Sequence, residues 1–216
     1  MKKIVIAVAL VCALALCAVA CSKKEEVQPQ LLGGWTLADS PVVTAQAQGL
    51  MDKALKGFTG ANYVPVAYVG SQVVAGTNHL LLCRANQVIP GAQETWALVT
   101  LYEDLDGNVT IKDVQNSGAQ TWLMDLMGGW YLADSPEVTA EVQAACVKAL
   151  EGWTGSVIEP VALVSTQVVS GTNYLLLAKV TPVEVGAQGE LALVTMYVDL
   201  QGAATFTDMV PFSQEQ

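Results

Sequence analysis

The chain has 216 residues, of which 52% are hydrophobic and 14% are charged, and its formal net charge is −10 at neutral pH. This length is sufficient for two small domains, each with a core of its own. The acidic balance excludes electrostatic attraction to nucleic acid or to anionic lipid headgroups. We therefore expect no nucleic-acid partner.

The first twenty residues have the pattern of a secretory signal peptide. Lys2 and Lys3 precede a short apolar run over residues 4–20. A basic start followed by a short apolar run is typical of a secretory signal and not of a mature membrane span. The run ends in Ala18-Val19-Ala20-Cys21, which resembles a bacterial lipobox, although Leu is more usual than Ala18 at its first position. This predicts cleavage before Cys21, acylation of Cys21 and attachment to the bacterial cell envelope or surface. The alternative is ordinary signal cleavage near Ala20 without a lipid.

A short polar tether and two copies of one unit follow. We assign residues 21–30 to the lipidated tether, 31–116 to the first unit, 117–125 to a linker and 126–216 to the second unit. The copies align without a gap at an offset of 95 residues (128 minus 33), and roughly half of the aligned positions are identical. Two copies are too few for a solenoid, so we expect two tandem domains of one fold.

Each unit begins with a predicted amphipathic helix. Asp39-Ser40-Pro41 places a capping residue ahead of a proline near the first helical turn. Apolar residues then recur at steps of three and four, and Gly57 and Gly60 are expected to end the helix. The stripe is Val43, Ala47, Leu50, Ala54 and Phe58 in the first copy and Val138, Val142, Ala145, Ala149 and Trp153 in the second.

Four strand-like runs follow the helix, at about 63–70, 77–85, 95–103 and 109–115 in the first copy. Asp106-Gly107 marks a tight hairpin between the last two runs. One helix followed by an antiparallel meander indicates the α+β class. We therefore predict two tandem domains, each with one helix packed across a four- to five-stranded antiparallel sheet.

A valine pair occupies the predicted turn between the first two runs. The motif is Gln72-Val73-Val74-Ala75-Gly76 in the first copy and Gln167-Val168-Val169-Ser170-Gly171 in the second. Turns are usually built from Gly, Asn, Asp and Pro, which suit their backbone angles. Two exposed valines gain nothing from water, so the motif favours a surface that binds a partner. The alternative is a continuous buried strand with a bulge at Gly76.

The remaining reactive side chains do not form a catalytic or metal-binding pattern. His79 precedes Cys83 by four strand residues, about 13 Å, which is too far for a thiol–imidazole pair. We expect His79 on the sheet surface, and Cys83 and Cys146 as small buried hydrophobes. The acidic segment 104–108 lacks the downstream bidentate Glu of a calcium loop. We predict no enzyme activity, no cofactor and no metal.

Gly33-Gly34 near the start of the first unit recurs as Gly128-Gly129 in the second. This Gly-Gly pair, the helix and the valine motif together resemble the cystatin family, the tight-binding inhibitors of papain-like cysteine proteases. The similarity is greatest to the disulfide-free stefins, whose loop continues as Gly-Thr-Asn-Tyr. Here that stretch is Gly76-Thr77-Asn78-His79 and Gly171-Thr172-Asn173-Tyr174. The resemblance covers about residues 31–115 and 126–210.

This resemblance implies reversible inhibition by a wedge that enters the protease cleft. Gly33-Gly34 or Gly128-Gly129 would supply its N-terminal trunk, and the valine motif its first hairpin loop, which covers the catalytic thiol. Leu105 and Leu200 occupy the second hairpin, where the family has a Pro-Trp or Leu-Pro pair, so this sequence departs from the family there. The alternatives are a module of the same fold that binds a peptide or partner without inhibiting a protease, and a surface adhesin or structural lipoprotein.

Overall fold

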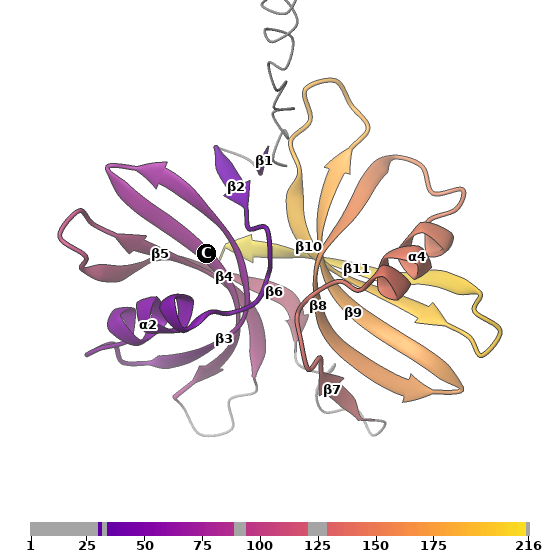
Figure 1. Ribbon diagram of the computed structural model, residues 1–216, viewed down its shortest axis with the longest axis horizontal. Helices are drawn as coiled ribbons and strands as arrows, with labels where there is room; N and C mark the ends of the chain where they lie inside the picture. The colour runs from indigo at the N-terminus through magenta and orange to yellow at the C-terminus, as the bar shows by residue number, and fades with distance from the viewer. Residues whose placement is uncertain (1–29, 32–33, 89–93, 121–128, 215–216) are drawn as a thin grey trace, which may run out of the picture.

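The computed structural model describes residues 30–31, 34–88, 94–120 and 129–214. Its eleven strands form a single sheet in the order β1-β2-β3-β4-β5-β6-β11-β10-β9-β8-β7. The sheet curls so that the halves formed by the two repeats lie side by side, with one short helix at the outer side of each half (Figure 1).

Both repeats contribute the same order of elements. Those of the first repeat are β1 (Gln30–Leu31), β2 (Trp35–Leu37), α2 (Ala45–Ala54), β3 (Ala61–Val74), β4 (Gly76–Gln87), β5 (Thr95–Glu103) and β6 (Val109–Gln120). Those of the second are β7 (Trp130–Leu132), α4 (Ala140–Ala149), β8 (Ser156–Val169), β9 (Gly171–Pro182), β10 (Glu190–Val198) and β11 (Ala204–Gln214).

The predicted α+β fold, with a helix packed across a separate sheet in each domain, is wrong. The repeats share one curled antiparallel sheet, because β6 pairs with β11 through Asn116 with Ser213 and Ser117 with Phe212. The two helices have ten residues each and are minor elements beside the sheet. The architecture is not the helix-across-sheet fold of the cystatins, so the stefin-like assignment is also wrong. The linker predicted at 117–125 falls partly in β6 and partly outside the described residues.

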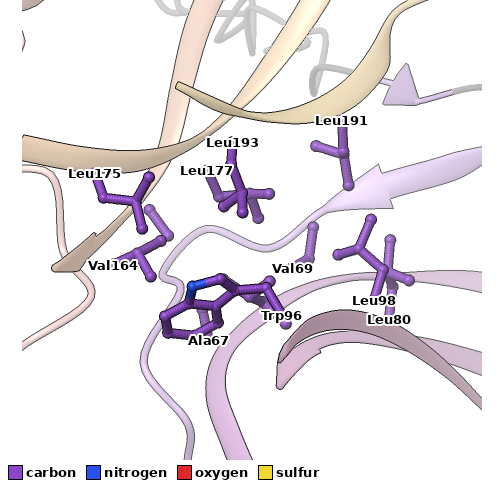
Figure 2. Packing of buried hydrophobic residues seen from close by; sticks show 12 residues of the cluster. Ala67, Val69, Leu80, Trp96, Leu98, Val164, Leu175, Leu177, Leu191 and Leu193 are labelled. Carbon is purple, nitrogen blue, oxygen red and sulfur yellow. The ribbon is translucent and has the colours of Figure 1, made fainter. Parts of the chain in front are cut away.

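Strands that are apolar on both faces explain why the repeats join. Along β4, Leu80 and Leu82 pack into a cluster that includes buried residues of both repeats, whereas Leu81 and Cys83 pack into the cluster beneath α2. Strands with both faces covered lack polar alternation. Figure 2 shows the shared cluster, in which Val69 and Trp96 of the first repeat gather with Leu175, Leu177 and Leu193 of the second.

The first helix starts later than predicted. The residue that caps α2 is Thr44, whose hydroxyl oxygen accepts a hydrogen bond from the backbone N–H of Ala47 at 3.2 Å. Asp39-Ser40-Pro41 is therefore not the cap. The carbonyl of Pro41 instead accepts a hydrogen bond from the N–H of Tyr68 at 2.9 Å, which ties this segment to β3 ahead of the helix. Thr139 caps α4 in the same way.

The outer strands of the sheet cover only part of their neighbours. β2 pairs with β3 at Ser71 and Gly70 alone, so the upstream part of β3 has no described strand on that side. This open part contains Pro65, where the pairing of β3 with β4 shifts its register. The equivalent shift in β8 occurs at Pro160.

Candidate binding surfaces at the two hairpin ends

Three segments that are distant in sequence meet at one end of each half of the sheet. The β3–β4 hairpin reverses at Ala75, because Val74 pairs with Gly76. The pairing of Thr77 with Glu103 brings the β5–β6 turn to the same end. β2, which begins directly after Gly34, pairs with β3 at Ser71, so Gly34 lies toward the same end of the sheet.

We name the resulting surfaces by their residues. The first tip surface comprises Gly34, Gln72–Gly76 and the turn at 104–108, and the second comprises Gly129, Gln167–Gly171 and the turn at 199–203. The structure therefore brings together the predicted trunk, first hairpin and second hairpin in both repeats. Gly33 and Gly128, also predicted for the trunk, lie outside the described residues, as does Cys21.

Large apolar side chains are exposed on both tip surfaces. In the first, Val73 is 85% exposed, Val74 is 42% exposed and Leu105 is 86% exposed. The equivalent exposures in the second are 73% for Val168, 45% for Val169 and 77% for Leu200. The same apolar group is exposed at both hairpin ends, which makes the two tips candidate binding surfaces.

The glycine that ends the valine motif is required by the hairpin geometry. Gly76 has φ +120° and Gly171 has φ +135°, a region that other residues rarely adopt. A β-carbon on Gly76 would collide with the backbone carbonyl oxygen of Glu103, and one on Gly171 with that of Val198. The missing side chain therefore allows each hairpin to lie close against the neighbouring strand.

A tyrosine braces each tip from that neighbouring strand. The hydroxyl of Tyr102 donates a hydrogen bond to the carbonyl of Ala75 at 2.6 Å, and Tyr197 donates in the same way to Ser170. Sequence reasoning missed this role, although both tyrosines recur at the repeat offset. The brace ties the carbonyl at the apex of each hairpin to the neighbouring strand.

The glutamine of each motif supports the hairpin from within. The side-chain amide of Asn78 donates to the side-chain oxygen of Gln72, and Asn173 donates to Gln167 at 2.7 Å. Gln72 and Gln167, which the resemblance placed among the protease-binding residues, are therefore half-buried and engaged with their own hairpins. The valines between them and the glycines form the outward part of the motif.

The β5–β6 turn is built around one aspartate. The carboxylate of Asp104 accepts backbone hydrogen bonds from Asp106 and Asn108, both at 2.9 Å, and a third from the Asn108 side chain at 2.8 Å. The Asn108 amide, followed by these backbone groups, lowers the pKa of Asp104. The oxygens of the Asp104 carboxylate are therefore engaged in hydrogen bonds within the turn. Within the described ranges, no group of three His, Cys, Asp or Glu residues could hold a metal ion.

The prediction that His79 lies on the sheet surface is wrong. Its side chain is 10% exposed, its Nδ1 is 2.9 Å from the hydroxyl of Tyr68, and its Nε2 is 3.2 Å from the carboxylate of Glu103. Burial raises the pKa of the Tyr68 phenol. His79 also lines a pocket of about 330 Å³ beside the start of α2. The cross-strand register that joins these residues is not visible in a sequence.

The prediction for the two cysteines is confirmed, since Cys83 and Cys146 are free thiols in buried positions. Burial raises the pKa of the Cys83 thiol strongly and that of the Cys146 thiol to about 11. Neither is a candidate nucleophile, because the thiolate is the reactive form.

Comparison with models of protein families finds no match, and no curated protein matches the chain. Among the helices of the described ranges, none combines the length and the apolar character needed to cross a membrane. The two tip surfaces are therefore the features of this chain that bear on its function.

Proposed function

We propose that the chain is a reversible, tight-binding inhibitor of papain-like cysteine proteases, and that each tip surface enters a protease cleft. The observation that carries this proposal is the convergence of three segments around two exposed valines on a braced turn. The protease class follows from the loop motif, which occurs in both repeats as Gln-Val-Val-Ala/Ser-Gly. The fold has no part in that choice.

The valines supply the main gain in free energy. Complete burial of a valine contributes about 1.5–3 kcal/mol. Scaled by the exposures of Val73 and Val74, burial of both in a partner contributes about 2–4 kcal/mol. The Tyr102 brace already orders the hairpin, so little conformational entropy remains to be lost on binding.

The tip can occupy a cleft without offering a bond for cleavage. A protease cleft binds extended polypeptide through its free backbone groups. At the first tip, Val73 pairs with Thr77 and Val74 with Gly76, and the carbonyl of Ala75 is held by Tyr102. Because this backbone is already paired across the hairpin, the segment is a poor substrate.

The other two segments widen the contact on either side of the valines. Gly34 allows close approach of a partner backbone, because nothing lies within 4 Å of the position that its β-carbon would take, whereas the ring of Tyr131 occupies that position at Gly129. Leu105 and Leu200 extend the apolar surface from the second turn. A three-part wedge that buries about 1,600 Å² in total is of the size that supports nanomolar binding.

Titration of papain with the chain starting at Ser22 tests the proposal, because this form retains every described residue. We expect competitive, reversible inhibition at nanomolar concentration or below, with trypsin unaffected. The matched control replaces Val73, Val74, Val168 and Val169 with Asp and should not inhibit. No inhibition of papain-like enzymes at micromolar protein would refute the proposal. Binding without inhibition would instead identify a non-inhibitory binding module.

We further propose that Cys21 carries the lipid that holds the protein at the cell envelope, as the lipobox-like sequence predicts. Two or three acyl chains give lasting membrane attachment, whereas one does not. The variant Cys21→Ala should leave the membrane fraction. A wild-type protein that fractionates as soluble would contradict this proposal and would leave the proposed inhibition unaffected.

A further inference from the structure

We propose that the two tip surfaces bind two protease molecules at the same time, so that one chain holds both. This inference rests on the proposed function and adds the stoichiometry of the complex. It is carried by the strand order, which mirrors itself about the central pair β6 and β11.

The mirrored order directs the two tips away from each other. β6 and β11 are antiparallel, and each is followed outward by the equivalent strands of its own repeat. An approximate two-fold relation of this kind reverses the direction of every equivalent strand. In Figure 1 the β3–β4 hairpin accordingly ends at the upper left and the β8–β9 hairpin at the lower right.

The shared core separates the two tips. Val69 and Val164 are equivalent and buried in that core, and each lies four strand residues before the first exposed valine of its tip. Four residues span about 13 Å, and packed sheets lie about 10 Å apart. Because the spacing between the sheets is perpendicular to the strands, the valines of the two tips are separated by roughly 28 Å.

This separation is sufficient because the tips face in opposite directions. A compact domain of about 220 residues has a radius of gyration of about 17 Å and hence an outer radius of about 22 Å. Two such bodies that shared one side of this chain would overlap at the tip separation. When two protease molecules approach from opposite ends of the chain, the half of the sheet to which each one binds lies between it and the other molecule.

The two tips are also structurally independent. The brace of the first tip joins Tyr102 to Ala75 and that of the second joins Tyr197 to Ser170, both within one repeat. Neither tip contributes to the shared core. Occupation of one tip thus requires no rearrangement at the other, and we expect two sites without cooperativity.

The test is the mass of the saturated complex, measured by light scattering after size exclusion. The probe is an inactive papain whose catalytic cysteine is replaced by alanine, mixed in excess with the chain that starts at Ser22. We expect two papain molecules on the wild-type chain. One each should bind to the variants Val73→Asp with Val74→Asp and Val168→Asp with Val169→Asp, and none to the fourfold variant.

Each alternative result has a distinct meaning. One papain on the wild-type chain and one on each double variant would overturn simultaneous binding while retaining the proposed function. One papain molecule on the wild-type chain and none on one of the double variants would also overturn simultaneous binding, because only one tip would then be active. No binding to any form would refute the proposed function itself. The wild-type mass alone decides the stoichiometry if a variant fails to fold, which thermal unfolding would reveal.

Discussion

Replacement of the two first-tip valines by alanine should weaken binding unequally. Val→Ala removes two methyl groups, worth about 0.8 kcal/mol each when buried. Val73 is 85% exposed before binding, so Val73→Ala should cost about 1.4 kcal/mol, a tenfold loss of affinity. Val74 is 42% exposed, so Val74→Ala should cost about 0.7 kcal/mol, a threefold loss.

The measurement needs a chain with one working tip. Val168→Asp and Val169→Asp in the background disable the second tip, and calorimetric titration of inactive papain then reports the first tip alone. Denaturant unfolding of each variant gives the control. Val73→Ala should leave the free energy of unfolding unchanged, and Val74→Ala should lower it slightly because part of this side chain is already packed.

The order of the two effects is the decisive point. An affinity loss for Val74→Ala equal to or greater than that for Val73→Ala would refute the argument that binding buries the outward face of the hairpin. No loss for either variant, with papain still bound, would show that the partner contacts a different surface.

Further predictions concern the second tip, the helix cap and the buried sulfur atoms. Gly171→Ala, which forces a methyl group against a strand β10 carbonyl at φ +135°, should cost about 1–3 kcal/mol in denaturant unfolding and weaken binding at the second tip. Thr44→Ala should cost about 1 kcal/mol by the same measurement, because it removes the cap of α2. Cys146→Met should destabilise by about 1–3 kcal/mol, since its sulfur lies 3.6 Å from that of Met196 and the larger side chain has no room there. Burial raises the pKa of Cys146 to about 11, so about one Cys146 thiol in a thousand is ionised at pH 8. Labelling of Cys146 by a thiol reagent should therefore be slow at pH 8, and it should become fast on unfolding or as the pH rises toward 11.

The tips could be predicted from the sequence because their signals are local. The valine motif sits between two strand runs, and the structure confirms a hairpin that reverses at Ala75. Asp106-Gly107 likewise marks a real turn between β5 and β6. The meeting of these turns with the segment at Gly34 was implied only by the resemblance, although alternate connections of a meander do lie at one end.

The joined sheet could not be read from either repeat alone. The pairing of β6 with β11 depends on contacts between repeats that no periodicity within one repeat reports. One signal did point to it. The run Leu80 to Cys83 is apolar at every position, which is typical of a strand covered on both faces. A single helix covers one face, so the other face required a second covering element, which is the other repeat.

The predicted start of the first helix was wrong for a different reason. Asp39-Ser40-Pro41 satisfies the rules for a cap, and nothing local ranks it below Thr44. The bond from Tyr68 to the carbonyl of Pro41 decides between them, and it is a tertiary contact. His79 was misplaced on similar grounds, because its partners Tyr68 and Glu103 are on neighbouring strands.

The prolines in β3 and β8 bear on whether the flanks of the sheet can pair with another chain. Within the described residues, the upstream parts of β3 and β8 have no strand on their outer side, and another chain could add there. Pro65 and Pro160 have no N–H to donate to an incoming strand, and their rings fix the local backbone. In a fibril built by pairing these flanks, the hydrogen bonding between neighbouring chains would therefore be interrupted at Pro65 and Pro160 of every chain. Substitution of both prolines would expose the chain to end-to-end polymerisation while leaving the hairpin tips in place.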